Sequence, residues 1–208
     1  MPFSAARVSA GCVMRIFYTD QYSGSRKDGE RKRRSRFLLE KVLYDCCGIP
    51  KKAEVLSEQR GRRYIDPVYG VDFSVTHTGN FWICAVSEKR CGIDAELRTR
   101  NFSSPEKLAE RFLTEAEQQY LQSEKSGSVS EGMLYLWTRK EAYLKYTGDG
   151  LYGLHCAPSV TDSPEGTRIR TWYGNSLCLS VCVPEGEMRE FPEMIDIMDA
   201  HERKKRNE

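Results

Sequence analysis

Residues 91–97 read CGIDAEL, an alternation of apolar and acidic residues that is typical of a β-strand. The apolar side chains of such a strand share one face. Asp94 and Glu96 share the opposite face about 7 Å apart, because successive side chains alternate. Two carboxylates at this distance repel each other unless a cation lies between them. The stretch therefore predicts either a cation site or an edge strand with a solvated acidic face.

A second stretch, WTRKEAYLK at residues 137–145, has the pattern of a helix. Trp137, Glu141 and Lys145 fall on one stripe of it, and Lys140 lies about 100° around the axis. On an exposed helix the Glu141–Lys145 pair would add only a few tenths of a kcal/mol. The surrounding large apolar residues instead indicate partial burial, where charges need partners.

Together these stretches offer three carboxylates, those of Asp94, Glu96 and Glu141, with lysines beside them. Ligands that are all oxygen favour a hard cation, and Mg²⁺ also accepts phosphate oxygens as ligands. Lysines complement the same phosphates. The sequence has no Gly-x-x-x-x-Gly-Lys-Ser/Thr loop, so a P-loop fold is excluded. The pattern indicates phosphoryl chemistry of another kind.

Composition sets wide limits on the protein. Its 208 residues carry a net charge of +2, enough chain for one large or two small domains. No apolar run approaches the roughly 20 residues of a membrane span, and the first residues lack a signal pattern, so we expect a cytoplasmic protein. The eight cysteines form no disulfide framework and no C-x-x-C pair, which favours reduced, mostly buried thiols.

The remaining elements follow from periodicity and punctuation. Strands are predicted at residues 11–18, 73–76, 81–86, 167–172 and 177–183, with a turn at residues 78–80. A first helix is predicted in the second half of a basic run from Arg26 to Lys41, and this helix ends before Gly48. A helical block is predicted over residues 105–122, with a capping box that begins at Thr114. A third helix is predicted over residues 131–147 and is ended by Gly148. Residues 123–131 are expected to form a loop, and residues 192–208 a frayed charged tail. The order of elements suggests two similar halves that meet near residue 92.

Three blocks then become specific in combination: FSVTHTG at residues 73–79, GIDAE at residues 92–96, and WTRKEAYLKYTGDGL at residues 137–151. In order and spacing they resemble the signature blocks of the 4′-phosphopantetheinyl transferases, in the larger, surfactin-type class. The resemblance spans roughly residues 30–155, and its third block is the most specific.

The resemblance implies an α+β fold with a pseudo-twofold arrangement of two similar subdomains, each a small β-sheet packed on a long α-helix. We expect an N-terminal subdomain over residues 1–91 that contacts the 3′-phosphate of coenzyme A. A C-terminal subdomain over residues 92–191 would hold the metal and catalytic residues, and the tail over residues 192–208 would follow. Because two internal halves build the cleft, a monomer is expected.

The resemblance also implies a Mg²⁺-dependent reaction in which coenzyme A gives its 4′-phosphopantetheine group to a serine of an apo acyl or peptidyl carrier protein and 3′,5′-ADP leaves. Asp94, Glu96 and Glu141 would hold the metal, and Glu141 would also take the serine proton. Lys145 and Lys140 would contact the phosphates, with Lys145 nearest the reacting group. The other expected contacts to coenzyme A are Arg36 at the 3′-phosphate, Arg62, Thr76 and His77.

Two of these positions depart from the family pattern. Thr76 stands where the family usually has serine, which keeps the hydroxyl group. Residues 61–63 read GRR where the family commonly has Gly-Lys-Pro, so Arg62 keeps the charge without the proline. Arg31 and Arg34 are looser alternatives to Arg36 for the 3′-phosphate.

Other interpretations stay open at this stage. His77 would serve equally as a core histidine, and the basic run as a solvated face; nucleic-acid binding is disfavoured because no aromatic residues interleave with the charges. Core packing is favoured for Phe102, Leu108, Phe112 and Leu113, although the family presents an apolar surface to its carrier protein nearby. A different Mg²⁺ enzyme such as a phosphodiesterase, or a paralogue that binds without turnover, is the alternative function. Neither the carrier, the pathway nor the choice of Mg²⁺ over Mn²⁺ is fixed by the sequence.

Overall fold

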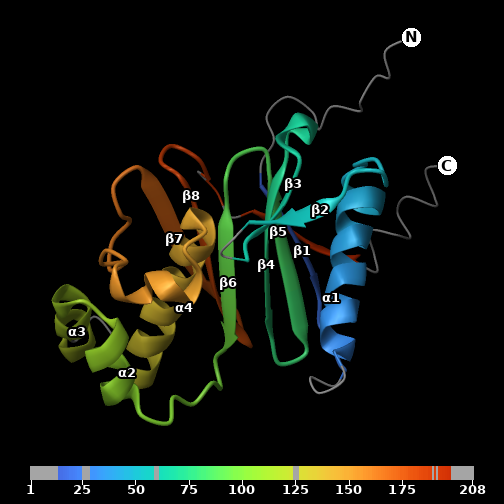
Figure 1. Cartoon of the computed structure of the whole chain (residues 1–208). Helices are drawn as coiled ribbons and strands as arrows, with labels where there is room; N and C mark the ends of the chain where they lie inside the picture. Colours follow the sequence, from blue (N-terminus) through green and yellow to red (C-terminus); the bar gives the residue numbers. More distant parts are fainter. Residues whose placement is uncertain are drawn as a thin grey trace.

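The computed structural model describes residues 14–24, 29–58, 61–123, 127–188, 190 and 192–197, and the first residues of the predicted strand at 11–18 and of the basic run lie outside them. Figure 1 shows a mixed α/β arrangement in which two sheets stand side by side between helices on the outer sides. In the described part of the chain no helix is long and apolar enough to cross a membrane.

The N-terminal sheet has the strand order β4-β5-β1-β9. β1 (Arg15–Thr19) and β4 (Asp72–Thr78) both run antiparallel to β5 (Phe81–Ser87), which confirms the strands and the turn predicted around Gly79. β9 (Glu193–Asp196) runs parallel to β1. This corrects the expectation of a frayed tail from residue 192, because the backbone of these residues pairs with the exposed edge of β1. A short hairpin, β2 (Val55–Ser57) and β3 (Arg63–Ile65), precedes the 3₁₀ turn η2 (Pro67–Tyr69).

A long helix covers one face of this sheet. α1 (Glu30–Glu40) continues into the π-helical turn η1 (Lys41–Cys46) and ends before Gly48, whose φ is 72°. Its buried side chains, Leu38 and Leu39 among them, pack in one core with Trp82. The Trp82 indole also donates a hydrogen bond to Ser35 at 2.9 Å. The apolar stripe thus faces inward and leaves the basic side chains outside, as the sequence predicts.

The C-terminal sheet is antiparallel with the order β6-β8-β7, formed by β6 (Gly92–Leu97), β8 (Leu177–Pro184) and β7 (Thr167–Tyr173). α4 (Val129–Thr147) packs on it and is followed by the 3₁₀ segment η4 (Gly150–His155). Gly92 allows the closest approach: a Cβ atom there would lie 2.1 Å from the carbonyl oxygen of Ala142. The helix and the strand that carry the predicted acids are therefore in direct backbone contact.

The predicted restart inside residues 105–122 separates α2 (Pro105–Phe112) from α3 (Glu115–Gln122). Thr114 and Glu117 form the expected capping box, with the Thr114 N–H donating to the Glu117 carboxylate at 2.7 Å. Phe102 and Leu113 are buried and Leu108 and Phe112 half-buried against the helices, in agreement with core packing. No disulfide forms among the described cysteines, and four of them are buried: Cys84, Cys91, Cys178 and Cys182.

Candidate active site

The two sheets meet along β4 and β6, which lie side by side (Figure 1) and are joined by side-chain hydroxyl groups. Thr76 donates to Asp94 at 2.8 Å, and Thr78 donates to Glu96 at 2.8 Å. One step along, the Ser74 hydroxyl accepts from a backbone N–H of β6 at 3.1 Å. Because these three hydroxyls alternate along β4, they share one face. The N-terminal half thereby holds the acids of the C-terminal half in place.

Lys145 reaches the same carboxylate from α4. Its Nζ lies 2.7 Å from Asp94 Oδ1 and 3.0 Å from the carbonyl oxygen of Ile93. The Asp94 side chain is 8% exposed and that of Lys145 28%, so the pair stands at the edge of the protein interior. Asp94 Oδ2 is buried and has no hydrogen-bond partner among the described residues. One carboxylate oxygen is therefore left for a further ligand.

Arg100 is a site residue that the sequence analysis missed. Its guanidinium group forms an ion pair with Glu96 and lies over the rings of Phe102 at 4.7 Å and Trp137 at 5.3 Å. The turn after β6 returns it to the acids, since its N–H donates to the Leu97 carbonyl at 2.9 Å. The only sequence signal for Arg100 is that a cationic residue stands four positions after a strand carboxylate and two positions before an aromatic residue.

Glu141 lies half-buried on α4 within the field of the same groups. Burial is the main cause that raises the pKa of Glu141, and the nearby Asp94 carboxylate raises it further, whereas Lys145 and Arg100 act against that rise. A carboxylate whose pKa is raised binds a proton more readily than an ordinary glutamate. Glu141 is thus suited to accept a proton from a reacting group.

The three carboxylates supply the donor atoms that a hard cation requires, and the unpartnered Asp94 Oδ2 is a free ligand atom. However, no group of three His, Cys, Asp or Glu side chains in the described ranges converges closely enough to hold a metal ion. In this structure Lys145 is paired with Asp94, and Arg100 with Glu96. The three acids thus have the donor atoms that suit a metal ion, while Asp94 and Glu96 are paired with cationic side chains.

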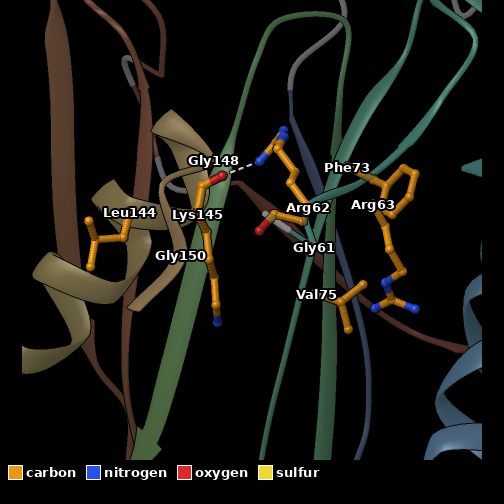
Figure 2. A pocket seen from close by; sticks show the side chains of 10 residues that line it. Gly61, Arg62, Arg63, Phe73, Val75, Leu144, Lys145, Gly148 and Gly150 are labelled. Atoms are coloured by element: carbon orange, nitrogen blue, oxygen red, sulfur yellow. Dashed lines mark hydrogen bonds between the residues drawn. The ribbon is translucent and has the colours of Figure 1, made fainter. Parts of the chain in front are cut away.

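A pocket of about 240 Å³ opens beside Lys145 (Figure 2). One wall comes from the N-terminal half and the other from the end of α4; the lining includes Gly61, Arg63, Phe73, Val75, Leu144 and Gly148. Arg63 also borders a groove of about 450 Å³ along α1, which is lined by Lys32, Arg33 and Arg36. Arg36 is exposed there and pairs with Glu40 at 2.9 Å. The pocket and the groove are separate cavities that share Arg63 as a lining residue.

His77 is exposed and borders a third pocket, of about 360 Å³, together with Arg31 and Arg100. Its ring stands 5.5 Å from that of Tyr22, over which the Arg31 guanidinium also lies at 4.7 Å. A buried core histidine is therefore not what the structure shows. The predicted alternative Arg34 is engaged elsewhere, with Gln21 at 2.7 Å.

Two predicted contacts to coenzyme A are already paired within the protein, although Arg62 also lines the pocket beside Lys145. Lys140 is fully buried, and its Nζ lies 2.8 Å from a carboxylate oxygen of Glu117, which joins α4 to α3. The Arg62 guanidinium lies 2.5 Å from the Asp72 carboxylate and donates to the backbone carbonyl of Lys145. Both cations are thus bound by the protein itself, and the direction of each side chain follows from a partner that is distant in sequence.

With this geometry in place, the chain can be compared with known proteins. Residues 90–192 match the sequence model of the 4′-phosphopantetheinyl transferase superfamily. The chain is 32% identical over 127 residues to the 4′-phosphopantetheinyl transferase gsp of Aneurinibacillus migulanus, a match that covers 61% of this chain and 52% of that protein.

Two further relatives show the same likeness. The 4′-phosphopantetheinyl transferase HetI of Nostoc sp. is 32% identical over 150 residues, 68% of this chain and 63% of HetI. The 4′-phosphopantetheinyl transferase Sfp of Bacillus subtilis is 28% identical over 95 residues, 46% of this chain and 41% of Sfp. The matched part spans about half the length of these curated relatives.

Proposed function

Because the chain belongs to the 4′-phosphopantetheinyl transferase superfamily, we propose that it transfers the 4′-phosphopantetheine group of coenzyme A to a serine of an apo acyl or peptidyl carrier protein. One observation carries the proposal: Thr76, Asp94 and Lys145, one from each signature block, are hydrogen-bonded in a row beside a pocket between the two halves. Relatives that carry the name of the surfactin-type enzymes are in keeping with the larger class.

Coenzyme A would occupy the pocket and extend past Arg63 to the basic groove along α1. Arg63 borders both, and Arg36 lies on the groove with other basic side chains, where a 3′-phosphate would find its counter-charge. His77 lines a separate pocket farther along β4, near the turn to β5. Thr76 takes part through the position of Asp94, since its hydroxyl donates to that carboxylate.

In the proposed reaction the serine hydroxyl oxygen forms a bond to the phosphorus that carries the pantetheine arm. The phosphorus–oxygen bond within the diphosphate breaks, and 3′,5′-ADP takes the electron pair and leaves. Glu141 accepts the serine proton, for which its raised pKa is suited. Lys145 Nζ holds a phosphate oxygen near the reacting centre. Positioning and electrostatic stabilisation supply most of the rate, as in other phosphoryl transfers.

Asp94, Glu96 and Glu141 would hold the Mg²⁺ ion of the family. When bound, the ion supplies neutralisation of the charge that builds on the leaving diphosphate. Lys145 pairs with Asp94, and Arg100 pairs with Glu96. The free oxygen of Asp94 makes it the ligand that is readiest for the ion.

The finer expectations from the sequence belong to the same proposal. They are the pseudo-twofold relation of the two halves, their division at residue 92, a monomeric state and a cytoplasmic location. Within the fold, a long helix packed on each sheet supports the first of these. The proposal covers carriers of fatty-acid, polyketide and peptide synthesis.

The decisive experiment mixes the protein with coenzyme A, Mg²⁺ and each of several apo carrier proteins, and weighs the carriers by mass spectrometry. We expect a carrier to gain one phosphopantetheine group, and Glu141→Ala to abolish this gain. Asp94→Ala should also abolish turnover while coenzyme A still binds through Arg36 and His77. The proposal fails if no carrier is modified, or if wild type and Glu141→Ala behave alike.

A further inference from the structure

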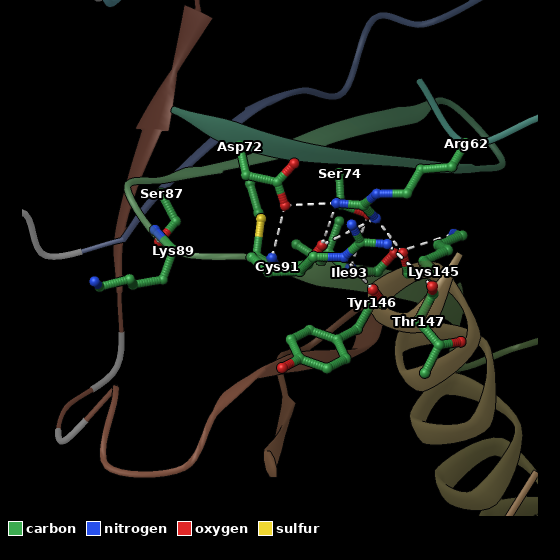
Figure 3. A network of polar contacts seen from close by, with 12 residues as sticks. Arg62, Asp72, Ser74, Ser87, Lys89, Cys91, Ile93, Lys145, Tyr146 and Thr147 are labelled. Carbon is green, nitrogen blue, oxygen red and sulfur yellow. Dashed lines mark hydrogen bonds and ion pairs between the residues drawn. The ribbon is translucent and has the colours of Figure 1, made fainter. Parts of the chain in front are cut away.

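Two arginines cap the C-terminal end of α4, the turn that carries Lys145 (Figure 3). Arg62 donates to the backbone carbonyl of Lys145 itself. Arg90 donates to the next two carbonyls, at 2.6 Å to Tyr146 and 3.0 Å to Thr147. The last carbonyls of a helix lack partners within the helix and carry partial negative charge, so cations there are stabilising.

The two arginines differ in how firmly they are held. The Arg62 side chain is 6% exposed, and its guanidinium lies 2.5 Å from the Asp72 carboxylate. Asp72 in turn accepts from the backbone N–H of Cys91 at 2.8 Å, just before β6. Arg90 is 41% exposed, and its acidic neighbour Glu58 is 3.9 Å away. Arg62 is therefore held in one orientation by a close, half-buried partner, whereas Arg90 stands at the surface.

Gly148 leaves the space that the arginines need. Its φ of 88° belongs to the left-handed region that favours glycine, and it ends the helix. A Cβ atom at this position would lie 3.1 Å from Arg90 Nη2 and 3.4 Å from Arg62 Cδ. A side chain there would press on both capping groups.

We propose that Arg62 is a positioning residue for Lys145 and makes no contact of its own with the ligand, an inference that rests on the proposed function. Arg62 comes from the loop that borders the pocket, and Lys145 from the opposite wall. Through Asp72 the guanidinium fixes the carbonyl of Lys145, and with it the point from which the side chain extends to Asp94. The Arg62–Asp72 pair thus sets where the lysine ammonium stands relative to a bound phosphate.

The distribution of hydrogen bonds on Arg62 supports this role. Its two terminal nitrogens donate to Asp72 and to the carbonyls of Lys145 and Cys91. The remaining donor, Nε, is buried and has no partner among the described residues. Both terminal nitrogens of Arg62 are thus engaged with the protein, even though the residue lines the pocket and its position in the sequence first indicates a phosphate contact.

A double-mutant cycle on coenzyme A binding tests the proposal, since it detects whether one residue acts through another. Calorimetric dissociation constants are compared for wild type, Arg62→Met, Lys145→Met and the double variant. We expect Arg62→Met to weaken binding about fivefold in the wild-type background and less than about 1.5-fold beside Lys145→Met. Equal losses in both backgrounds would mean direct contact with the ligand and would overturn the proposal, as would no loss in either.

Arg90→Met is the matched control, because it removes an arginine from the same helix end without touching the carbonyl of Lys145. Its effect on binding should stay below about twofold. Asp72→Asn is the second variant should Arg62→Met fail to fold: it keeps the shape of the side chain, removes the charge that holds Arg62, and should likewise lose its effect beside Lys145→Met.

The kinetic readout separates the two proposals. In carrier modification, Arg62→Met should lower kcat about tenfold with a smaller rise in KM for coenzyme A, and Arg62→Lys should recover part of the loss. A raised KM with unchanged kcat would contradict positioning. A wild type that binds coenzyme A but modifies no carrier would remove the transferase function, and the binding cycle would still decide the role of Arg62.

Discussion

Lys140 and Lys145 lie little more than one turn apart on α4, and each pairs with a carboxylate from another element. The side chains of Lys140 and Glu117 are 1% and 0% exposed, whereas those of Lys145 and Asp94 are 28% and 8% exposed. The first pair is sealed between two helices, and the second borders the pocket. One short motif therefore supplies one lysine to the fold and another to the chemistry.

The sealed pair is tolerated because Glu117 is well satisfied. Its carboxylate caps α3 by accepting from Thr114 at 2.7 Å, and it also accepts from the backbone N–H of Val160 at 2.9 Å. Burying two charges is costly unless such hydrogen bonds accompany the ion pair. Asp94, by contrast, keeps one oxygen without a partner among the described residues, which suits a residue that has to take a ligand. The structural pair is enclosed, and Lys140 Nζ has the Glu117 ion pair but no further hydrogen bond among the described residues. The functional pair instead leaves an oxygen of Asp94 without a partner at the edge of the protein interior.

The largest effect is expected from Lys145→Met. It should lower the rate of carrier modification about 10³-fold, close to 4 kcal/mol of transition-state stabilisation, because a cation beside the transferring phosphate is lost. The free energy of unfolding, measured by urea titration, should fall by only about 1 kcal/mol, since this lysine is partly exposed. A loss of stability that matches the loss of activity would erase the distinction between the two lysines.

Lys140→Met should show the opposite pattern. It leaves the Glu117 carboxylate buried without its cation, so the free energy of unfolding should fall by about 3 kcal/mol. The folded fraction should retain its KM for coenzyme A within about threefold. Adding Glu117→Gln, which removes the stranded charge but keeps hydrogen-bond acceptors, should restore at least half of the stability. A stable Lys140→Met protein with a tenfold higher KM for coenzyme A would instead mean that Lys140 contacts the phosphates.

Arg100 sharpens the comparison on the pocket side. Because it neutralises Glu96 where a divalent cation would bind, Arg100→Gln should raise the affinity of the ligand-free protein for Mn²⁺ about tenfold, as followed by electron paramagnetic resonance. Arg98→Gln is the control: Arg98 carries the same charge but faces Glu131 at 3.8 Å, outside the site. Equal gains in Mn²⁺ affinity in both variants would mean that the effect comes from net charge alone.

The smallest effect concerns Thr76. Thr76→Ser keeps the hydroxyl that donates to Asp94, so its turnover should stay within about twofold of wild type. Thr76→Val has the same shape without the donor and should lose about fivefold, close to the net value of one hydrogen bond. Initial rates at saturating coenzyme A measure both. If valine and serine behave alike, the hydroxyl seam between the halves has no part in holding the acid.

The sequence predicts most elements of this fold because their signals are local. Alternation predicts β4 and β6, and a short apolar run predicts β5. The capping box of Thr114 and Glu117 predicts the restart before α3, and Gly148 ends α4. β9 escapes prediction because only four residues pair with β1, and charged neighbours mask the short strand. Its formation depends on a partner near the other end of the chain, which no local pattern records.

The sequence predicts which residues belong to the site better than it predicts where their side chains point. Asp94 and Lys145 meet as the blocks suggest. The sequence of α4 alone does not predict that Lys140 is buried against Glu117. Residues on several sides of α4 contact apolar side chains, and Glu117 belongs to another helix. Arg62 is similar: its charge is visible in the sequence, but Asp72 and the helix end that claim it are tertiary partners. Charged residues in a sequence indicate that a site exists more reliably than they indicate which of them contact the ligand.

The return of β9 to the first sheet has a consequence for handling the protein. β1 lies between β5 and β9, so both of its edges are covered. A chain that is shortened before Glu193 would uncover a strand with the apolar residues Ile16 and Phe17, and open strand edges recruit other chains. Removing this end, which includes the buried Ile197, would therefore act first on aggregation during expression. Trimming for crystallisation or fusion should leave the segment up to Ile197 intact.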